Sequence, residues 1–246
     1  MNALIELSEN NRENLLRLEE KLGYTFRDRW LLQLALVHRS FSFEQVRKLA
    51  TDNERLEFLG DAVLDLVVGR ALFELYPEMR EGEMTRLRAL LVNESYLAEM
   101  ATTLGLGEFL LLGRGEETTQ GRAKPSILSS AYEALLGALF QDGGFEIAAA
   151  FIDQQFLPVL DSQRQKLLQA DAKSRLQEIL QESFSEAPTY VLDSAEGPDH
   201  RKAFTVSVCF RGLVLAQGQA FNKKEAEQAA AAEALRLLPE LGLLPA

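Results

Sequence analysis

Residues 53–61 read Asn-Glu-Arg-Leu-Glu-Phe-Leu-Gly-Asp, and this stretch decides how the N-terminal part of the chain is interpreted. At helical spacing its three acids, Glu54, Glu57 and Asp61, project from one face while its leucines occupy another. Mainly apolar residues follow, up to Val68, and leave little helix surface for solvent. Like charges in such surroundings destabilise a helix unless a cation or protonation offsets them. The stretch predicts a cation site, with an exposed acidic helix face as the plainer alternative.

The composition is typical of a globular protein. Of 246 residues, 47% are hydrophobic and 26% are charged, which suits one large or two modest domains. The single cysteine, Cys209, excludes an intrachain disulfide and a cysteine-rich zinc site and is compatible with a reducing cytoplasm. We expect neither secretion nor membrane insertion, because the sequence shows no basic-then-apolar leader and no apolar run of spanning length. The net charge of −11 argues against nucleic-acid binding by the whole surface, but a local basic patch stays open.

Two regions with different patterns follow one another. Helical periodicity from about residue 12 to residue 160 predicts an all-α domain, with turn signals at Gly23, at Glu81-Gly82, over 113–125 and over 142–144. Residues 161–170 fit a short linker or the tail of a helix. Beyond them the pattern predicts the order α-β-β-β-α, with helices over 174–183 and 223–238 and strands over 189–193, 203–210 and 213–219.

Two further segments carry acids that need an explanation. Glu81 and Glu83 stand at the start of a helix rich in cations, where a capping role and a functional role are both open. Glu133 is the single acid in an apolar helix that begins near Ser126. A carboxylate in such surroundings needs a partner.

A meeting of Glu57, Asp61 and Glu133 would give hard oxygen ligands suited to Mg²⁺. Such a metal can activate water and stabilise the leaving oxygen of a phosphodiester. The sequence contains no Gly-rich phosphate loop, no HExxH and no GxSxG motif. With His38 and His200 as its two histidines, nucleophilic triads have little support.

Five segments, in this order and spacing, resemble the catalytic domain of bacterial ribonuclease III: HRSF from His38, NERLEFLGD from Asn53, EGEMTRLRA from Glu81, LGRGEE from Leu112 and SILSSAYEALLGALF from Ser126. The resemblance covers nearly the whole chain. It implies an all-α catalytic domain at 12–160, a linker at 161–170 and an α-β-β-β-α double-stranded-RNA-binding domain at 171–240. It also implies a homodimeric, metal-dependent endoribonuclease that cuts double-stranded RNA to 5′-phosphate and 3′-hydroxyl ends with short 3′ overhangs, in the processing of ribosomal, messenger and transfer RNA.

The same resemblance assigns roles to single residues. The implied catalytic residues are Glu54, Asp61, Glu81 and Glu133, and the implied ligands of Mg²⁺, for which Mn²⁺ can substitute, are Glu57, Asp61, Ser130 and Glu133. The helix from Asn53 to Gly69 is implied to lie at a symmetric dimer interface, so that two centres cut the two strands of one duplex.

Ser130 departs from the family, which usually has an aspartate at this position. A serine offers a neutral oxygen, so the site loses one negative charge. We expect an enzyme that still cuts but needs more metal or prefers Mn²⁺. The alternative is a double-stranded-RNA-binding regulator with weak or no cleavage, and a third, weaker interpretation is a structural protein whose acids are surface charges.

The C-terminal segments KSRLQEILQ from Lys173, GPDH from Gly197 and NKKEAEQAAAAEAL from Asn222 resemble a double-stranded-RNA-binding domain. Such domains read the A-form shape through 2′-hydroxyls and phosphates. The implied RNA contacts are Gln177, Glu178 and His200 in successive minor grooves, and Lys223 and Lys224 at phosphates, where the helix dipole also favours anions. Residues 171–246 carry eight Lys and Arg against eleven Asp and Glu, so affinity depends on clustering. Taken alone, the lysine pair also fits a solvated helix start, and the histidine a surface loop.

Overall fold

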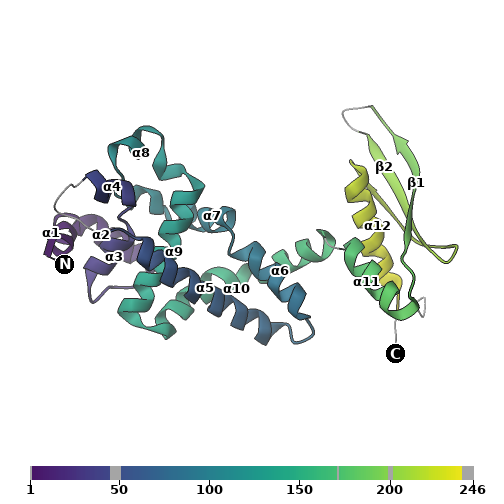
Figure 1. The fold of residues 1–246 in the computed structure, drawn as a ribbon, viewed down its shortest axis with the longest axis horizontal. Coiled ribbons are helices and arrows are strands. Elements are labelled where there is room, and N and C mark those ends of the chain that lie inside the picture. The colour runs from purple at the N-terminus through teal and green to yellow at the C-terminus, as the bar shows by residue number, and fades with distance from the viewer. Residues whose placement is uncertain (1, 45–50, 171, 199–201, 240–246) are drawn as a thin grey trace. The chain divides into compact units, whose positions relative to one another are not determined.

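The computed structural model describes residues 2–44, 51–170, 172–198 and 202–239. The chain divides into two compact units, residues 1–160 and 161–246. The first is helical, and the second has a three-stranded sheet and two helices (Figure 1). The predicted fold class, an all-α domain followed by an α-β-β-β-α domain, is confirmed. No helix in the described ranges is both long and apolar enough to cross a membrane.

The first unit consists of short outer helices around a long central pair. The outer elements before the pair are α1 (Asn2–Asn10), α2 (Arg12–Leu22), α3 (Arg29–Ala35) and α4 (Arg39–Glu44). The central helices are α5 (Glu54–Leu75) and α9 (Pro125–Gly143). Between them in sequence lie α6 (Glu81–Leu91), α7 (Glu94–Leu104), η1 (Leu106–Phe109), α8 (Arg114–Thr118) and η2 (Gly121–Ala123). After them comes α10 (Phe145–Ala170), which belongs to the first unit up to residue 160.

Some local expectations need correction. The helical region starts with α1, ahead of the expected start near residue 12, and α1 packs against α3. The expected loop 113–125 contains α8 and η2, because the Glu117 N–H donates to the Gly113 carbonyl at 3.0 Å and closes a helical turn. The expected turn Glu81-Gly82 is the first turn of α6, where acids compensate the helix dipole. Of the two alternatives for residues 161–170, a short linker or a helix tail, the structure has the second, because they form the last part of α10.

Two glycines bring α5 and α9 into backbone contact. A methyl group on Gly60 would overlap the carbonyl oxygen of Glu133, and one on Gly137 would overlap the carbonyl oxygen of Leu56. Only residues without a Cβ permit this approach. Buried leucines, valines and alanines of both helices surround the contact and form the core of the unit. The pair therefore holds the acidic faces of α5 and α9 close together.

The second unit has the elements α11 (Ala172–Phe184), β1 (Thr189–Glu196), β2 (Ala203–Phe210), β3 (Leu213–Ala220) and α12 (Lys223–Leu237). The strands form an antiparallel sheet in the order β1-β2-β3. Arg211 and Gly212 join β2 to β3 with positive φ angles of 51° and 79°, as a tight two-residue hairpin requires. A methyl group on Gly218 would overlap the backbone of α12, so this helix lies directly on the sheet, and the apolar core fills the space between them.

Candidate active site

The acids of α5 and α9 face one another across the helix contact. Ser130 on α9 donates a hydrogen bond of 3.0 Å from its hydroxyl to Oε1 of Glu57 on α5. Burial raises the pKa of Glu133 to about 7, and the carboxylates of Asp61 and Glu57 add to the shift in that order. The Glu133 carboxyl is therefore within electrostatic reach of both Asp61 and Glu57.

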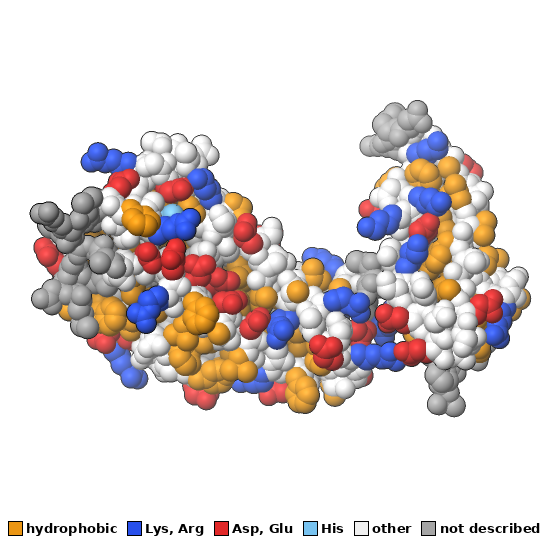
Figure 2. Space-filling view, viewed as in Figure 1, with side chains coloured by type: hydrophobic (Ala, Val, Ile, Leu, Met, Phe, Trp, Pro, Cys, Tyr) orange, Lys and Arg blue, Asp and Glu red, His pale blue; other side chains and the backbone are white. Residues whose placement is uncertain are grey.

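Asp61 lies one turn beyond Glu57 on α5 and is exposed. Its pKa is raised, first because the surrounding helix surface removes part of the hydration of the carboxyl and second because Asp65 lies nearby. Figure 2 shows Asp and Glu side chains gathered along α5 on the face in view, next to hydrophobic side chains. Within the described ranges, no three His, Cys, Asp or Glu side chains are arranged to hold a metal ion together. The ligand set implied by the resemblance therefore remains a proposal.

A pocket of about 210 Å³ opens at the N-terminal ends of α5 and α9. The residues that line it are His38, Arg39, Asn53, Glu54, Glu57, Ser126, Ile127 and Ser130. Asn53 fixes the start of α5 here, since it is almost fully buried and its Nδ2 donates to the Ala35 carbonyl at 3.3 Å. The Glu57–Ser130 pair lies in the pocket wall, so the pocket adjoins the acid cluster.

The structure separates the other two predicted acids. Glu54 lines the pocket and pairs with Arg39, with Nη1 and Oε1 3.5 Å apart. Glu81 lies on α6, is not among the residues lining the pocket, and accepts a hydrogen bond of 3.0 Å from Thr85 Oγ1. The neighbouring Glu83 accepts the Arg80 N–H at 3.1 Å as part of a capping box, so its capping role is confirmed.

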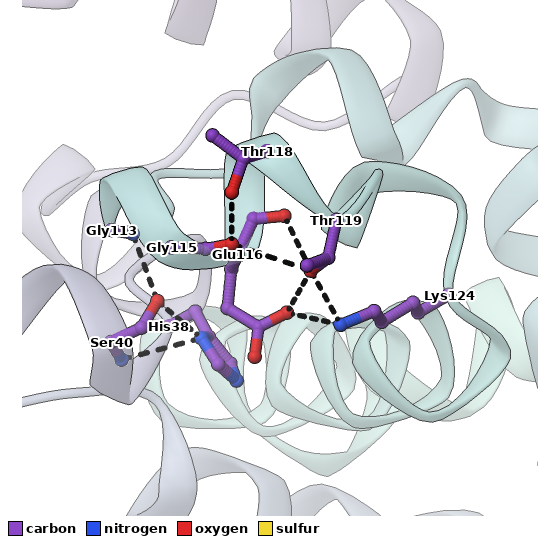
Figure 3. Close-up of polar contacts among 8 residues, drawn as sticks. All are labelled: His38, Ser40, Gly113, Gly115, Glu116, Thr118, Thr119 and Lys124. Atoms are coloured by element: carbon purple, nitrogen blue, oxygen red, sulfur yellow. Dashed lines mark hydrogen bonds and ion pairs between the residues drawn. The ribbon is translucent and has the colours of Figure 1, made fainter.

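The sequence alone does not show that the segment 38–40 lies at the pocket, because the segment stands out there only as part of a family signature. His38 and Arg39 line the pocket. The Ser40 hydroxyl contacts Nδ1 of the His38 imidazole at 2.8 Å, as Figure 3 shows. A histidine followed by polar residues forms no pattern of spacing that would indicate a site. The pairing of this segment with Leu111, which brings it beside α5 and α9, joins residues more than 70 positions apart.

The predicted RNA-binding residues of the second unit are exposed where they are described. Gln177 and Glu178 lie on the outer surface of α11. Lys223 and Lys224 form the first turn of α12, and no ion pair within the described residues involves them. His200 lies outside the described residues.

Comparisons with known proteins agree with these observations. A family model described as "Ribonuclease-III-like" matches residues 28–160, and one described as "Double-stranded RNA binding motif" matches residues 172–238. The chain is 57% identical to "Ribonuclease 3" of Desulfotalea psychrophila over 96% of this chain and 98% of that one. It is 46% identical to "Ribonuclease 3" of Syntrophotalea carbinolica over 91% of this chain and 96% of that one.

Solved structures are similar to the first unit. The crystal structure of the nuclease domain of ribonuclease III from Campylobacter jejuni is 48% identical, with a TM-score of 0.53, and the match covers 58% of this chain and 96% of that one. A second structure from the same organism, also 48% identical and with a TM-score of 0.52, describes structural flexibility in a region involved in dimer formation, and covers 57% and 96% of the two chains.

Proposed function

We infer the function of this protein from one premise: the chain belongs to the ribonuclease III family. It is an endoribonuclease that acts on double-stranded RNA, since a nuclease domain of this family is joined to a double-stranded-RNA-binding motif. The observation that carries the assignment is the set of acids facing one another across the α5–α9 contact. We place it in the cytoplasm and assign to it products with 5′-phosphate and 3′-hydroxyl ends and short 3′ overhangs.

We propose that Glu57, Asp61 and Glu133, with the neutral oxygen of Ser130, hold a divalent cation, Mg²⁺ or Mn²⁺. The donor set fits, because these ions prefer hard oxygens and Mg²⁺ retains several waters beside a few carboxylates. The raised pKa of Glu133 supports the fit, because burial first and the carboxylates of Asp61 and Glu57 second make the charged form costly, and a cation would offset that cost. When bound, the cation supplies the activation of water and the charge stabilisation that phosphodiester hydrolysis needs.

The residues of the chain prepare this site. The hydrogen bond from Ser130 fixes Oε1 of Glu57 and leaves Oε2 available as a ligand. The backbone contact at Gly60 keeps Glu133 within electrostatic reach of Asp61. Because the helix backbones already lie in contact, we propose that the carboxylates converge on one ion through rotation of their side chains. Glu54 and Glu81 are assigned supporting roles at the cleavage valley of the dimer.

A homodimer follows from the surface of α5. Phe58, Leu66 and Phe73 are 79%, 59% and 72% exposed, which is unusual for large apolar side chains gathered on one helix. A pocket of about 460 Å³ lined by Trp30, Leu34 and Leu59, among others, lies beside the same helix. A two-fold interface needs such self-complementary features on one surface. Two centres related by the two-fold axis would cut the two strands of one duplex.

The second unit is assigned to substrate binding. Lys223 and Lys224 lie where the N-terminus of α12 adds its positive dipole end, and we propose that they contact phosphates. Gln177, Glu178 and His200 are proposed to contact minor grooves. Ribosomal, messenger and transfer RNA precursors are the proposed substrates.

The second candidate function is a double-stranded-RNA-binding regulator with weak or no cleavage. Ser130 favours it, since the site has one charge fewer than the family pattern. The retention of Glu57, Asp61 and Glu133 favours catalysis instead.

The two are separated by incubating an end-labelled long RNA duplex with the purified protein over a range of Mg²⁺ and Mn²⁺, with Glu133→Ala as the blank. Short duplex products with 3′ overhangs that vanish in the variant support the nuclease. Binding without cleavage in either metal supports the regulator.

A further inference from the structure

His38 lies outside the acid cluster and outside the RNA-binding unit, yet its imidazole lines the active-site pocket. Its backbone is fixed, because the His38 N–H donates to the Leu111 carbonyl at 3.1 Å next to the bridge between Val37 and Leu111. The pocket has a volume of about 210 Å³. Such a space has room for one ribose or one phosphate of an RNA strand but not for a base pair.

The hydrogen bonds of Nδ1 determine which ring nitrogen carries the proton. The backbone N–H of Ser40 donates to Nδ1 at 3.3 Å, and the Ser40 hydroxyl oxygen lies 2.8 Å from the same atom (Figure 3). A backbone N–H can only donate, so Nδ1 is the acceptor. The Ser40 hydroxyl is oriented in turn, since its oxygen accepts the Gly113 N–H at 2.8 Å. The hydrogen of the neutral ring therefore resides on Nε2.

Two features of the surroundings support this arrangement. A Cβ on Gly113 would lie 2.7 Å from the Ser40 carbonyl oxygen, so only glycine lets its N–H approach the Ser40 hydroxyl. Burial lowers the pKa of His38, which favours the neutral ring. Glu116, Asp52 and Glu54 act in the opposite direction, and Arg39 acts in the same direction as burial. The Glu116 carboxylate, the strongest of the opposing groups, is already bound by Lys124 at 2.6 Å.

We propose that the Nε2–H group of His38 donates a hydrogen bond to an oxygen of the RNA backbone and so positions the strand beside Glu57 and Ser130. Nε2 has no hydrogen-bond partner among the described residues, and in Figure 3 it lies at the edge of the ring opposite Ser40. Glu54 and Glu57 contribute carboxylates to the pocket, and these can only accept hydrogen bonds. An oxygen of the RNA backbone that enters the pocket therefore needs a hydrogen-bond donor, which Nε2–H of His38 provides. The acceptor is a ribose 2′-hydroxyl or a phosphate oxygen. The inference rests on the proposed nuclease function.

The test uses a duplex with one cleavage site, in which single nucleotides near the cut carry either a 2′-deoxy sugar or a methylphosphonate. For the wild-type protein, one replacement is expected to lower kcat/KM by about 3- to 10-fold, the effect of removing one hydrogen bond. The His38→Ala protein should cleave the unmodified duplex with a kcat/KM that is lower by the same factor. For this variant, the same replacement in the RNA should cause no further loss of kcat/KM, while the other replacements should act as they do on the wild type. The type of replacement that shows this coupling identifies the oxygen.

Two matched variants separate the hydrogen bond from a structural role. The side-chain amide of His38→Gln reaches the position of Nε2 and should retain most activity and the sensitivity, whereas the shorter His38→Asn should behave like His38→Ala. Thermal midpoints of all three variants check that the fold is intact. If His38→Ala keeps the sensitivity of the wild type to every replacement, the proposed contact does not exist.

Equilibrium binding of the same duplexes to the Glu133→Ala protein, with and without His38→Ala, distinguishes this inference from the proposed function. If the wild-type protein does not cleave, but its binding is weakened by one replacement and this effect depends on His38, the nuclease function is rejected and the His38 contact is supported. Cleavage with a sensitivity independent of His38 rejects the contact and keeps the nuclease. Absence of any binding rejects both.

Discussion

The hydroxyl of Ser130 donates a hydrogen bond of 3.0 Å to Oε1 of Glu57 across the contact between α5 and α9. An aspartate at this position would place a fourth carboxylate among Glu57, Asp61 and Glu133. The serine thus donates a hydrogen bond to a carboxylate where an aspartate would add another carboxylate. Its consequence for metal affinity can be measured directly.

Ser130→Asp is expected to lower the Mg²⁺ concentration for half-maximal cleavage by about tenfold, corresponding to about 1.4 kcal/mol, because it adds one anionic ligand. Ser130→Asn introduces a side chain of nearly the same size as aspartate but without the charge, and it serves as the control. The measurement is cleavage rate against metal concentration for the three proteins. If Ser130→Asp and the wild type reach half-maximal cleavage at the same Mg²⁺ concentration, the missing carboxylate at position 130 does not limit metal binding.

The pKa of about 7 at Glu133 predicts how the metal-free stability depends on pH. Because this pKa is raised above the unfolded value, the folded state binds more protons between about pH 4.5 and 7, so stability falls as pH rises through that window. Screening by water limits the loss in free energy of unfolding to about 1 kcal/mol. This loss is equivalent to a decrease of roughly 2–4 °C in the thermal midpoint. In EDTA, Glu133→Gln should raise the thermal midpoint by this amount at pH 8 and leave it unchanged at pH 4. An equal shift at both pH values would show that packing, and not charge, is responsible.

Gly60→Ala should destabilise the protein, because its methyl group would overlap the Glu133 carbonyl oxygen. Overpacking of this kind costs about 1–3 kcal/mol. The matched control is Gly69→Ala on the same helix, where the nearest atom, Arg88 Nη1, is 3.6 Å from the added Cβ and a gain in helix propensity is expected. Urea unfolding of both variants measures the difference. Equal stabilities would show that α5 and α9 do not meet at their backbones.

Phe58→Asp should convert the dimer to monomers, because it puts a charge in place of an apolar side chain that is 79% exposed in the single chain. Removal of a central aromatic side chain from an interface costs at least about 2 kcal/mol, or roughly 30-fold in the dissociation constant. Phe221→Asp is the control, since Phe221 is similarly exposed, at 74%, but belongs to the second unit. Sedimentation velocity over a concentration series reports the mass. A dimer of unchanged affinity would place the interface elsewhere.

Lys223→Ala combined with Lys224→Ala should weaken binding of duplex RNA and reduce the slope of log affinity against log salt by about one for each phosphate that these lysines neutralise. Arg236→Ala is the control on the same helix, because Arg236 is already engaged by Glu233 at 2.6 Å. Binding isotherms at several salt concentrations give both slopes. Equal slopes for the double variant and the wild type would remove the lysine pair from the interface.

Local sequence signals predicted the regular parts of the fold well. The strands over 203–210 and 213–220 match the alternation of apolar residues, and the apolar run around Glu133 matches α9. The helix α1 and the short helices within 113–125 were missed, because polar sequences there fold through contacts with distant segments.

The candidate site was predictable only in its composition. The helical spacing of Glu57 and Asp61 identified one acidic face, and the isolation of Glu133 identified another. No spacing rule could show that Ser130 would bond to Glu57, because this bond depends on how α5 and α9 pack. The contact between Ser40 and His38 is local, but the Ser40 hydroxyl is itself oriented by the N–H of the distant Gly113. Family resemblance supplied the proposed roles of Glu57 and Ser130 but gave none to His38 or Ser40.

The backbone contact at Gly60 and Gly137 has a consequence for how this enzyme can diversify. The separation of α5 and α9 is set there by van der Waals contact between backbone atoms and not by the volume of any side chain. Substitutions elsewhere in the core cannot widen or narrow it by small steps. Adaptation to a new substrate or metal must therefore come from replacing the groups that project into the pocket, as Ser130 illustrates, while the scaffold stays constant.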